Sequence, residues 1–131
     1  MALPNGAGGY QLGDGNVGEA QLTVQGAPTA LTAAATVTAA QLANGLFTFN
    51  GTAGNMTLPT VADLEAGISS ASKVNAAFDF YVVNTDNADA ITLTVGTGWT
   101  IVGAAAVSSA TSAHFRARKT GDGTWTCYRI S

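Results

Sequence analysis

The feature that most constrains the fold is a series of short segments in which apolar and polar residues alternate. Residues 90–96 place Ile91, Leu93 and Val95 on one side and threonines on the other, and residues 77–84 repeat the pattern with aromatic residues. A period of two residues is the signature of a half-buried strand. About eight such segments follow one another at intervals of about 8–12 residues, separated by turn-forming residues. This spacing predicts an all-β fold, a small antiparallel β-sandwich or barrel of jelly-roll-like type.

Helix signals are much weaker than strand signals in this chain. Thr60 stands in the N-cap position of residues 60–68, where apolar residues recur at helical spacing, so one short helix is expected there. Residues 39–44 are a candidate for one further helical turn, with Thr38 as N-cap and Gly45 as C-cap, although the preceding residues favour a strand. Because no long helices alternate with the strands, a parallel α/β sheet is not expected.

The N-terminal part of the chain differs from the rest. It begins with a glycine-rich stretch without hydrophobic periodicity, and ordering such a stretch costs more backbone entropy than it can recover alone. We therefore expect a Gly-rich, extended N-terminal arm over residues 1–30 and a β domain over residues 31–131. The arm is either a disordered tail or a segment that orders on a partner. Tyr10 and Leu12 favour the second alternative, because they offer apolar contacts.

The second half of the arm carries one alternating segment. In residues 17–25, Ala20, Leu22 and Val24 share one face, and a Gly-Ala-Pro step ends the pattern. The alternation predicts a short strand, the first along the chain.

Positive charge is concentrated in the last twenty residues, which form a predicted β-hairpin. No basic residue precedes Lys73, and the hairpin turn at Asp122 is followed by a glycine that can supply a positive φ. His114 alternates with Arg116 and Arg118 and should share their face. Two compatible interpretations stay open: an edge strand kept soluble by its charges, and a contact with an acidic partner surface. The basic residues of the hairpin are Arg116, Arg118, Lys119 and Arg129.

The overall composition favours a subunit of an assembly. Charged residues make up 10% of the chain, whereas a typical soluble domain has about 25%. A free monomer usually places more charge on its surface, so much of this surface is expected to be covered by partners. A net charge of −3 argues against nucleic acid or a membrane surface as the partner. Without a targeting segment or a spanning apolar run, the chain is expected to stay in the cytoplasm until it assembles.

The residues that carry chemistry are too few for a predicted active site. One histidine, His114, and one cysteine, Cys127, cannot supply a zinc site, and no nucleophile motif is present. The acidic loop over residues 85–89 lacks calcium-loop spacing and is interpreted as an Asx turn. Cys127 is interpreted as a buried small hydrophobe, because Trp125, Tyr128 and Ile130 surround it in the sequence. We expect no enzymatic activity, no cofactor and no metal.

Three runs of sequence, taken in order, resemble a known family. They carry the steps TAAQL and TLPT before residue 61, TGWT at residues 97–100, and FRARKTG at residues 115–121. In order and spacing they resemble the capsid decoration (cement or head-fibre) proteins of tailed bacteriophages. The similarity extends over roughly residues 32–131 and does not include the N-terminal arm.

The resemblance implies a structural virion protein. Such proteins are small β domains, commonly homotrimers, that bind the major capsid protein on the capsid exterior after assembly in the host cytoplasm. They bridge neighbouring capsid subunits, stabilise the shell and have no active site or cofactor. In this chain, the residues expected to contact the partner are Tyr10, Leu12, Arg116, Arg118 and Arg129.

A second function from a different class stays open. The chain could be a glycan- or receptor-binding module of a phage tail or fibre. Trp99, Trp125 or Tyr128 would then be the platform on which a sugar ring lies.

Overall fold

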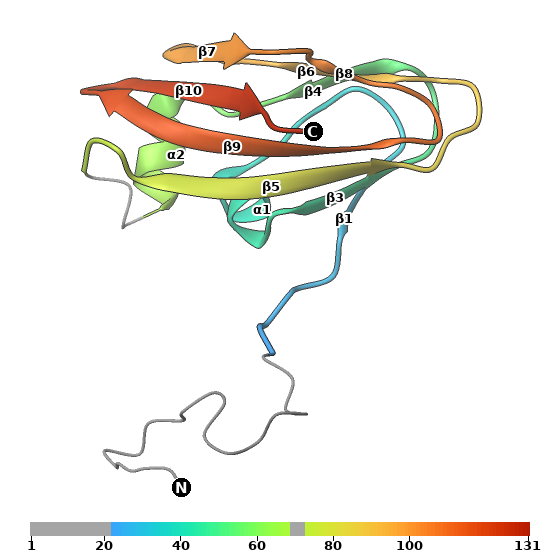
Figure 1. Cartoon of the computed structure of the whole chain (residues 1–131), viewed down its shortest axis with the longest axis horizontal. Helices are drawn as coiled ribbons and strands as arrows, with labels where there is room; N and C mark the ends of the chain where they lie inside the picture. Colours follow the sequence, from blue (N-terminus) through green and yellow to red (C-terminus); the bar gives the residue numbers. More distant parts are fainter. Residues whose placement is uncertain (1–21, 69–72) are drawn as a thin grey trace, which may run out of the picture.

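A computed structural model describes residues 22–68 and 73–131, and within them ten strands form two sheets, with two short helices (Figure 1). The larger sheet has six strands, in the order β1 (Thr29–Leu31), β3 (Leu46–Phe49), β5 (Ala77–Asn84), β9 (Ser112–Gly121), β10 (Thr124–Arg129) and β7 (Trp99–Val102). The smaller sheet has four, in the order β2 (Ala35–Thr36), β4 (Gly54–Thr57), β6 (Ile91–Thr94) and β8 (Ala106–Val107). The all-β prediction is confirmed.

The chain alternates between the two sheets from β1 to β8, adding one strand to each in turn. Between two successive strands of one sheet, the chain thus forms a strand of the other sheet. Successive strands of the same sheet therefore often run in the same direction. Five of the eight pairings are parallel, and only β5–β9, β9–β10 and β6–β8 are antiparallel. The predicted antiparallel arrangement of the strands is therefore wrong, because most of the pairings are parallel. The two sheets do not confirm a jelly-roll-like sandwich or barrel.

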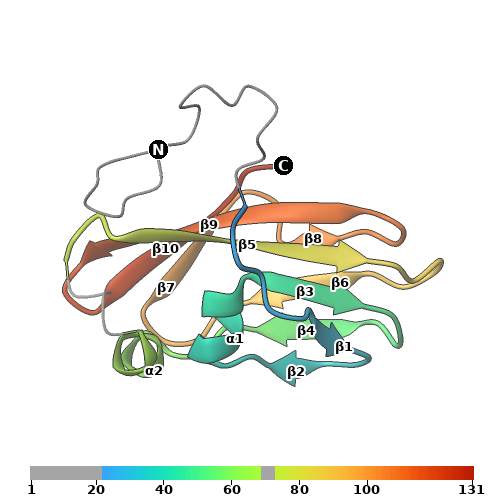
Figure 2. The ribbon, with the colours of Figure 1, turned by 90° about the horizontal axis from the view of Figure 1, so that it is seen from below.

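Two helices are present among the described residues: α2 (Val61–Gly67), where one short helix was expected, and α1 (Ala39–Asn44), where one further helical turn was a candidate. They lie next to each other at one end of the sheets (Figure 2). The hydroxyl of Thr38 accepts a bond from Gln41 N at 3.2 Å, while the Gln41 side chain accepts one from Thr38 N. Gly45 ends α1 with φ of 80°, a conformation that favours glycine. The caps predicted for residues 39–44 are therefore confirmed.

The second helix also begins where its cap was predicted. Thr60 accepts a bond from Asp63 N at 3.2 Å, and Leu64 turns into the core. Each helix spans a place where the chain crosses from the four-stranded to the six-stranded sheet. Their caps satisfy backbone N–H groups that would otherwise be unpaired at these crossings.

The core lies between the sheets and is rich in aromatic side chains. Phe80 stacks on Phe115 with ring centroids 5.2 Å apart, and Phe47 meets Phe80 edge to face at 6.2 Å. Trp125 and Cys127 follow on β10, and both are buried, which confirms the prediction for Cys127. The remaining core is built from residues of both sheets and both helices, so the two layers share one interior.

The segment before β1 differs from its prediction. Residues 22–28 form no strand, and the part of residues 17–25 that precedes them lies outside the described residues. Leu22 is 87% exposed and Val24 fully exposed. Gln25 fastens the segment to the end of α1, since its amide nitrogen donates to Asn44 O at 2.7 Å. Beyond that anchor the segment runs away from the β domain (Figure 1).

Candidate partner-binding face

The six-stranded sheet turns one face to the core and the other, here called the outer face, away from it. Strand register brings the outward side chains of β5, β9, β10 and β7 into transverse rows. One row runs from Tyr81 to His114, and the next runs from Asp79 through Arg116 and Tyr128 to Val102. This face brings together two of the predicted partner-binding arginines. Its named members are Asp79, Tyr81, Val102, His114, Arg116, Arg118, Tyr128 and Ile130.

An ion pair lies at the centre of the outer face. Arg116 donates two hydrogen bonds to the Asp79 carboxylate, from Nε at 2.6 Å and from Nη2 at 2.9 Å. These bonds hold the pKa of Asp79 below its ordinary value, although partial burial opposes the shift, and the same contact raises the pKa of Arg116. The pair is bidentate, so it fixes the guanidinium in one orientation. About half of the Arg116 side chain still faces solvent.

An aromatic stack lies beside this ion pair. The rings of Tyr81 and His114 are 4.5 Å apart and inclined by 23°. His114 Nε2 lies 3.3 Å from Asp79 Oδ2, but without the alignment of a hydrogen bond, and it has no hydrogen-bond partner among the described residues. The stack borders an open pocket of about 390 Å³ that reaches Leu46 and Ser131. Tyr81 is 45% exposed and is the most accessible aromatic side chain of the described residues.

The other predicted arginines do not all share this face. Arg118 lies on it, donating to Asn75 Oδ1 at 2.8 Å and to the Tyr128 hydroxyl at 2.9 Å. Arg129 lies on the opposite side of β10, with its guanidinium 5.5 Å from the ring centre of Phe115. Its Nη1 donates to two backbone carbonyls of the segment that ends at β8, and Nε donates to Ser131 O. The structure therefore groups Arg116 with Arg118 and separates Arg129 from them.

Lys119 faces the interior, where it forms an ion pair with a partly exposed carboxylate. It is 6% exposed, and its Nζ lies 2.8 Å from Glu65 Oε2 on α2. The indole N–H of Trp125 donates to the same oxygen at 3.0 Å. The Lys119 bond is the main cause of the lowered pKa of Glu65, followed by the Trp125 bond. The hairpin thus has two carboxylate partners, Asp79 and Glu65, that lie far from it in the sequence.

Two residues of the outer face were missed by sequence reasoning. Asp79 and Tyr81 occupy the polar side of the alternating segment over residues 77–84, opposite its buried aromatic residues. The alternation alone would have been enough to predict that Asp79 and Tyr81 face away from the core. No local feature of the sequence indicated that β5 pairs with β9, and it is this pairing that places Asp79 and Tyr81 next to the basic hairpin. Tyr10 and Leu12 lie outside the described residues.

The aromatic platform expected for sugar binding is not available at the tryptophans. Trp125 and Trp99 are buried, and Trp99 donates its indole N–H to Pro59 O at 2.8 Å. Tyr128 is half-buried, with the Arg118 guanidinium 5.8 Å from its ring centre. The tryptophan part of the glycan hypothesis is therefore wrong, because both rings are needed to fill the core.

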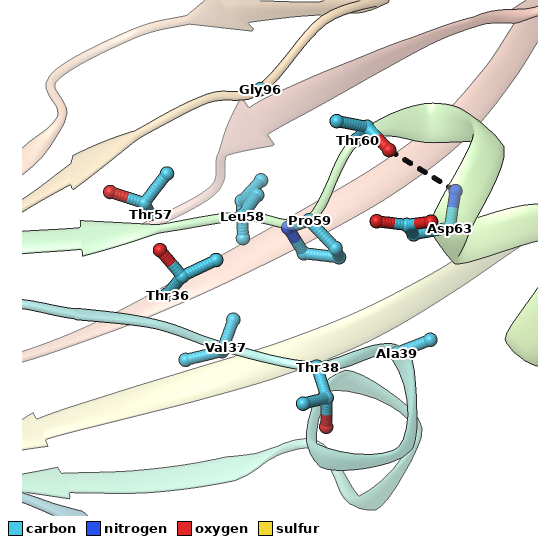
Figure 3. Close-up of a pocket in the computed structure, with 10 residues that line it drawn as sticks. All are labelled: Thr36, Val37, Thr38, Ala39, Thr57, Leu58, Pro59, Thr60, Asp63 and Gly96. Carbon is cyan, nitrogen blue, oxygen red and sulfur yellow. Dashed lines mark hydrogen bonds between the residues drawn. The ribbon is translucent and has the colours of Figure 1, made fainter.

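A second pocket, of about 500 Å³, opens where β2, β4 and β6 end (Figure 3). Threonines and apolar side chains line most of it. The Thr38 and Thr60 hydroxyls are bonded to helix N–H groups, and Thr57 shares a hydrogen bond with Thr94 at 2.8 Å. These lining hydroxyls are thus already engaged in holding the fold, so the pocket presents few polar groups for a ligand. The residues around it are Thr36, Val37, Thr38, Ala39, Thr57, Leu58, Pro59, Thr60, Asp63 and Gly96.

No group of three or more His, Cys, Asp or Glu side chains in residues 22–68 and 73–131 is arranged to hold a metal ion. Over the same residues, neither helix has the length and apolar character needed to cross a membrane. Comparison with protein-family models, curated proteins and solved structures finds no match to this chain. The outer face and the sequence are therefore the features that bear on function.

Proposed function

We propose that the chain is a structural virion protein that decorates the exterior of a tailed-phage capsid. The outer face of the six-stranded sheet is its contact with the major capsid protein, and a homotrimer bridges neighbouring capsid subunits to stabilise the shell. The sequence resemblance to decoration proteins supports this role. The low charge of the chain supports it as well, because it suits a surface that is covered after assembly.

One observation carries the proposal: the outer face combines exposed apolar side chains with charges that are already paired. Tyr81, Val102 and Ile130 are large exposed residues of this face, and Arg116 and Arg118 are held by partners within the chain. Tyrosine and arginine are enriched where protein interfaces bind most strongly. Arginines held in place before binding lose less side-chain entropy when a partner carboxylate arrives.

The direct test is binding to shells assembled from the major capsid protein encoded by the same genome. Tyr81→Ala and Arg116→Ala should each reduce the amount of chain that co-sediments with shells. Thr92→Ala is the matched control, because Thr92 points outward from the four-stranded sheet. If the control loses as much co-sedimentation with shells as the outer-face variants do, the outer face is not the contact.

Oligomeric state tests the trimer separately. Light scattering of the purified chain should give three times the 13.1 kDa chain mass. A trimer multiplies modest contacts through avidity, so each copy can bind weakly while the set stays attached. A monomer at all concentrations, with shell binding retained, would restrict the proposal to single-copy decoration.

The N-terminal arm is tested by deletion. Removing residues 1–16 should weaken shell binding while leaving the β domain folded, because the described core begins at Leu31. Unchanged occupancy on shells would exclude Tyr10 and Leu12 from the contact.

One observation favours the glycan-binding alternative: Tyr81, stacked on His114, offers a flat exposed ring beside an open pocket. A glycan array distinguishes the two functions. Saturable binding that is lost in Tyr81→Ala supports a glycan site, and the decoration proposal expects no such ligand.

A further inference from the structure

Large apolar side chains are exposed in two places among the described residues. One set is on the segment before β1, where Leu22 and Val24 alternate with Thr23 and Gln25. The other lies on the outer face and includes Val102 of β7, which is 48% exposed. The alternation in the segment is that of a strand, yet none of the strands in residues 22–68 and 73–131 pairs with it. An extended segment of this kind is suited to adding to an open sheet edge.

The six-stranded sheet has such an open edge at β7. Gly98 O accepts a hydrogen bond from Trp125 N at 3.0 Å, so the backbone groups of alternate residues from Gly98 onward face β10. The groups of Ile101 then point the other way, toward the edge, because successive residues of a strand direct their N–H and C=O to opposite sides. β7 is the last strand in the sheet order of the described residues. Unpaired edge groups of this kind are a template for another strand.

The segment cannot reach this edge within its own chain. Gln25 is tied to Asn44, just before β3, and Leu22 lies three residues beyond it. Three residues span no more than about 10 Å when fully extended. β7 lies four strands beyond β3, which is roughly 19 Å at about 4.8 Å per strand. Leu22 and Val24 therefore lie near the β1 edge of the sheet and Val102 lies on the β7 edge, so they can meet only between copies.

We propose that residues 22–25 of one copy add as a strand to the open edge of β7 in a neighbouring copy, with Leu22 and Val24 beside Val102. This inference deepens the homotrimer of the proposed function and rests on it. The contact joins unlike surfaces, so each copy donates a strand at one edge and accepts one at the other. Contacts of this type close into a ring when the rotation between copies permits, and three copies complete the proposed trimer.

Disulfide trapping tests the contact directly. A Val24→Cys chain mixed with a Val102→Cys chain should form a linked dimer on oxidation, seen on a non-reducing gel. The matched control mixes Val24→Cys with Thr48→Cys, which lies on β3 near the opposite edge of the sheet. The native Cys127 is buried and should not compete. Equal linking in the control, or no linking in a sample that is trimeric, would overturn the proposal.

A second measurement keeps the test independent of cysteine geometry. Leu22→Asp or Val24→Asp should convert the trimer to monomer in light scattering, whereas Thr23→Asp adds the same charge on the other side of the strand and should leave more trimer. A trimer that survives both apolar-to-Asp changes contradicts the strand exchange.

The outcomes also separate this inference from the proposed function. A trimer that exchanges strands but does not bind shells contradicts decoration and supports the exchange. Shell binding by a chain that is monomeric at every concentration supports decoration and overturns the exchange.

Discussion

Asp79 and Arg116 face each other directly across the antiparallel pair β5–β9, joined by hydrogen bonds of 2.6 and 2.9 Å. They are 37 residues apart in the chain, and only the strand register brings them together. The pair neutralises one charge of the basic hairpin on the face that we propose for partner contact. A face with paired charges is easier to desolvate than one with free cations.

The lowered pKa of Asp79 predicts a pH-dependent effect of Asp79→Asn. A carboxyl whose folded pKa is depressed contributes stability above its unfolded value, and that contribution is lost as the pH falls through the folded pKa. The variant should therefore unfold at lower urea concentration than the wild type at pH 7. The difference in urea midpoint between the wild type and the variant should become smaller as the pH drops below 3.8, the ordinary pKa of an aspartate carboxyl.

The matched control for this measurement is Asp122→Asn in the hairpin turn. It removes the same formal charge, and Asn-Gly suits the turn as well as Asp-Gly does. A gap between wild type and Asp79→Asn that stays constant from pH 7 to pH 3 would contradict the prediction.

The contacts of Glu65 predict that two substitutions at this position lower the stability of the fold by different amounts. Glu65→Ala leaves the Lys119 ammonium without its carboxylate and the Trp125 N–H without its acceptor. Lys119 is the buried member of the pair, so its charge stays largely desolvated when the carboxylate is removed, and this destabilises the folded state. Glu65→Gln keeps an acceptor oxygen and should be milder. Thermal unfolding at pH 7 checks the order, and equal melting temperatures for the two variants would contradict it.

Cys127 should be unreactive in the folded protein. Burial raises the pKa of its thiol to about 12, so the nucleophilic thiolate is scarce at pH 8. A thiol reagent such as DTNB should label the native chain only at the rate of unfolding and label the urea-denatured chain at once. Complete labelling of native protein within seconds would show that the strand β10 opens locally.

The neighbours Phe80 and Tyr81 should respond differently to truncation. Phe80 is fully buried in the core, so Phe80→Ala should lower the free energy of unfolding by about 3–5 kcal/mol. Tyr81 points to the outer face, and Tyr81→Ala should change that free energy by less than about 1 kcal/mol. Urea titration gives both values. A larger loss at Tyr81 than at Phe80 would reverse the assignment of the two faces.

The capping box of α1 predicts a small, specific effect at Thr38. Thr38→Ala removes the acceptor for Gln41 N and should cost about 1 kcal/mol of stability. Thr38→Ser keeps the hydroxyl and should stay close to the wild type. Equal losses in both variants would point to the methyl group, which borders the pocket of Figure 3, in place of the cap.

Local patterns in the sequence predicted the faces and the caps. The alternation over residues 77–84 and 90–96 assigned inward and outward side chains correctly. Thr38, Thr60 and the positive φ of Gly123 in the hairpin turn were also predictable. Each of these features depends on residues within a few positions of one another, so a short stretch of sequence contains the whole interaction.

Only the tertiary structure decided the direction of the strands and the carboxylate partners of the basic residues. It also decided whether residues 22–25 form a strand. A period of two residues is the same in parallel and antiparallel strands, so alternation could not reveal five parallel pairings. Asp79 and Glu65 meet the hairpin through strand register and helix packing across tens of residues. The segment at Leu22 has strand alternation, but none of the described strands pairs with it, so its pattern alone could not make it a strand. Pairing requires a partner in space, and the sequence specifies that partner only through the whole fold.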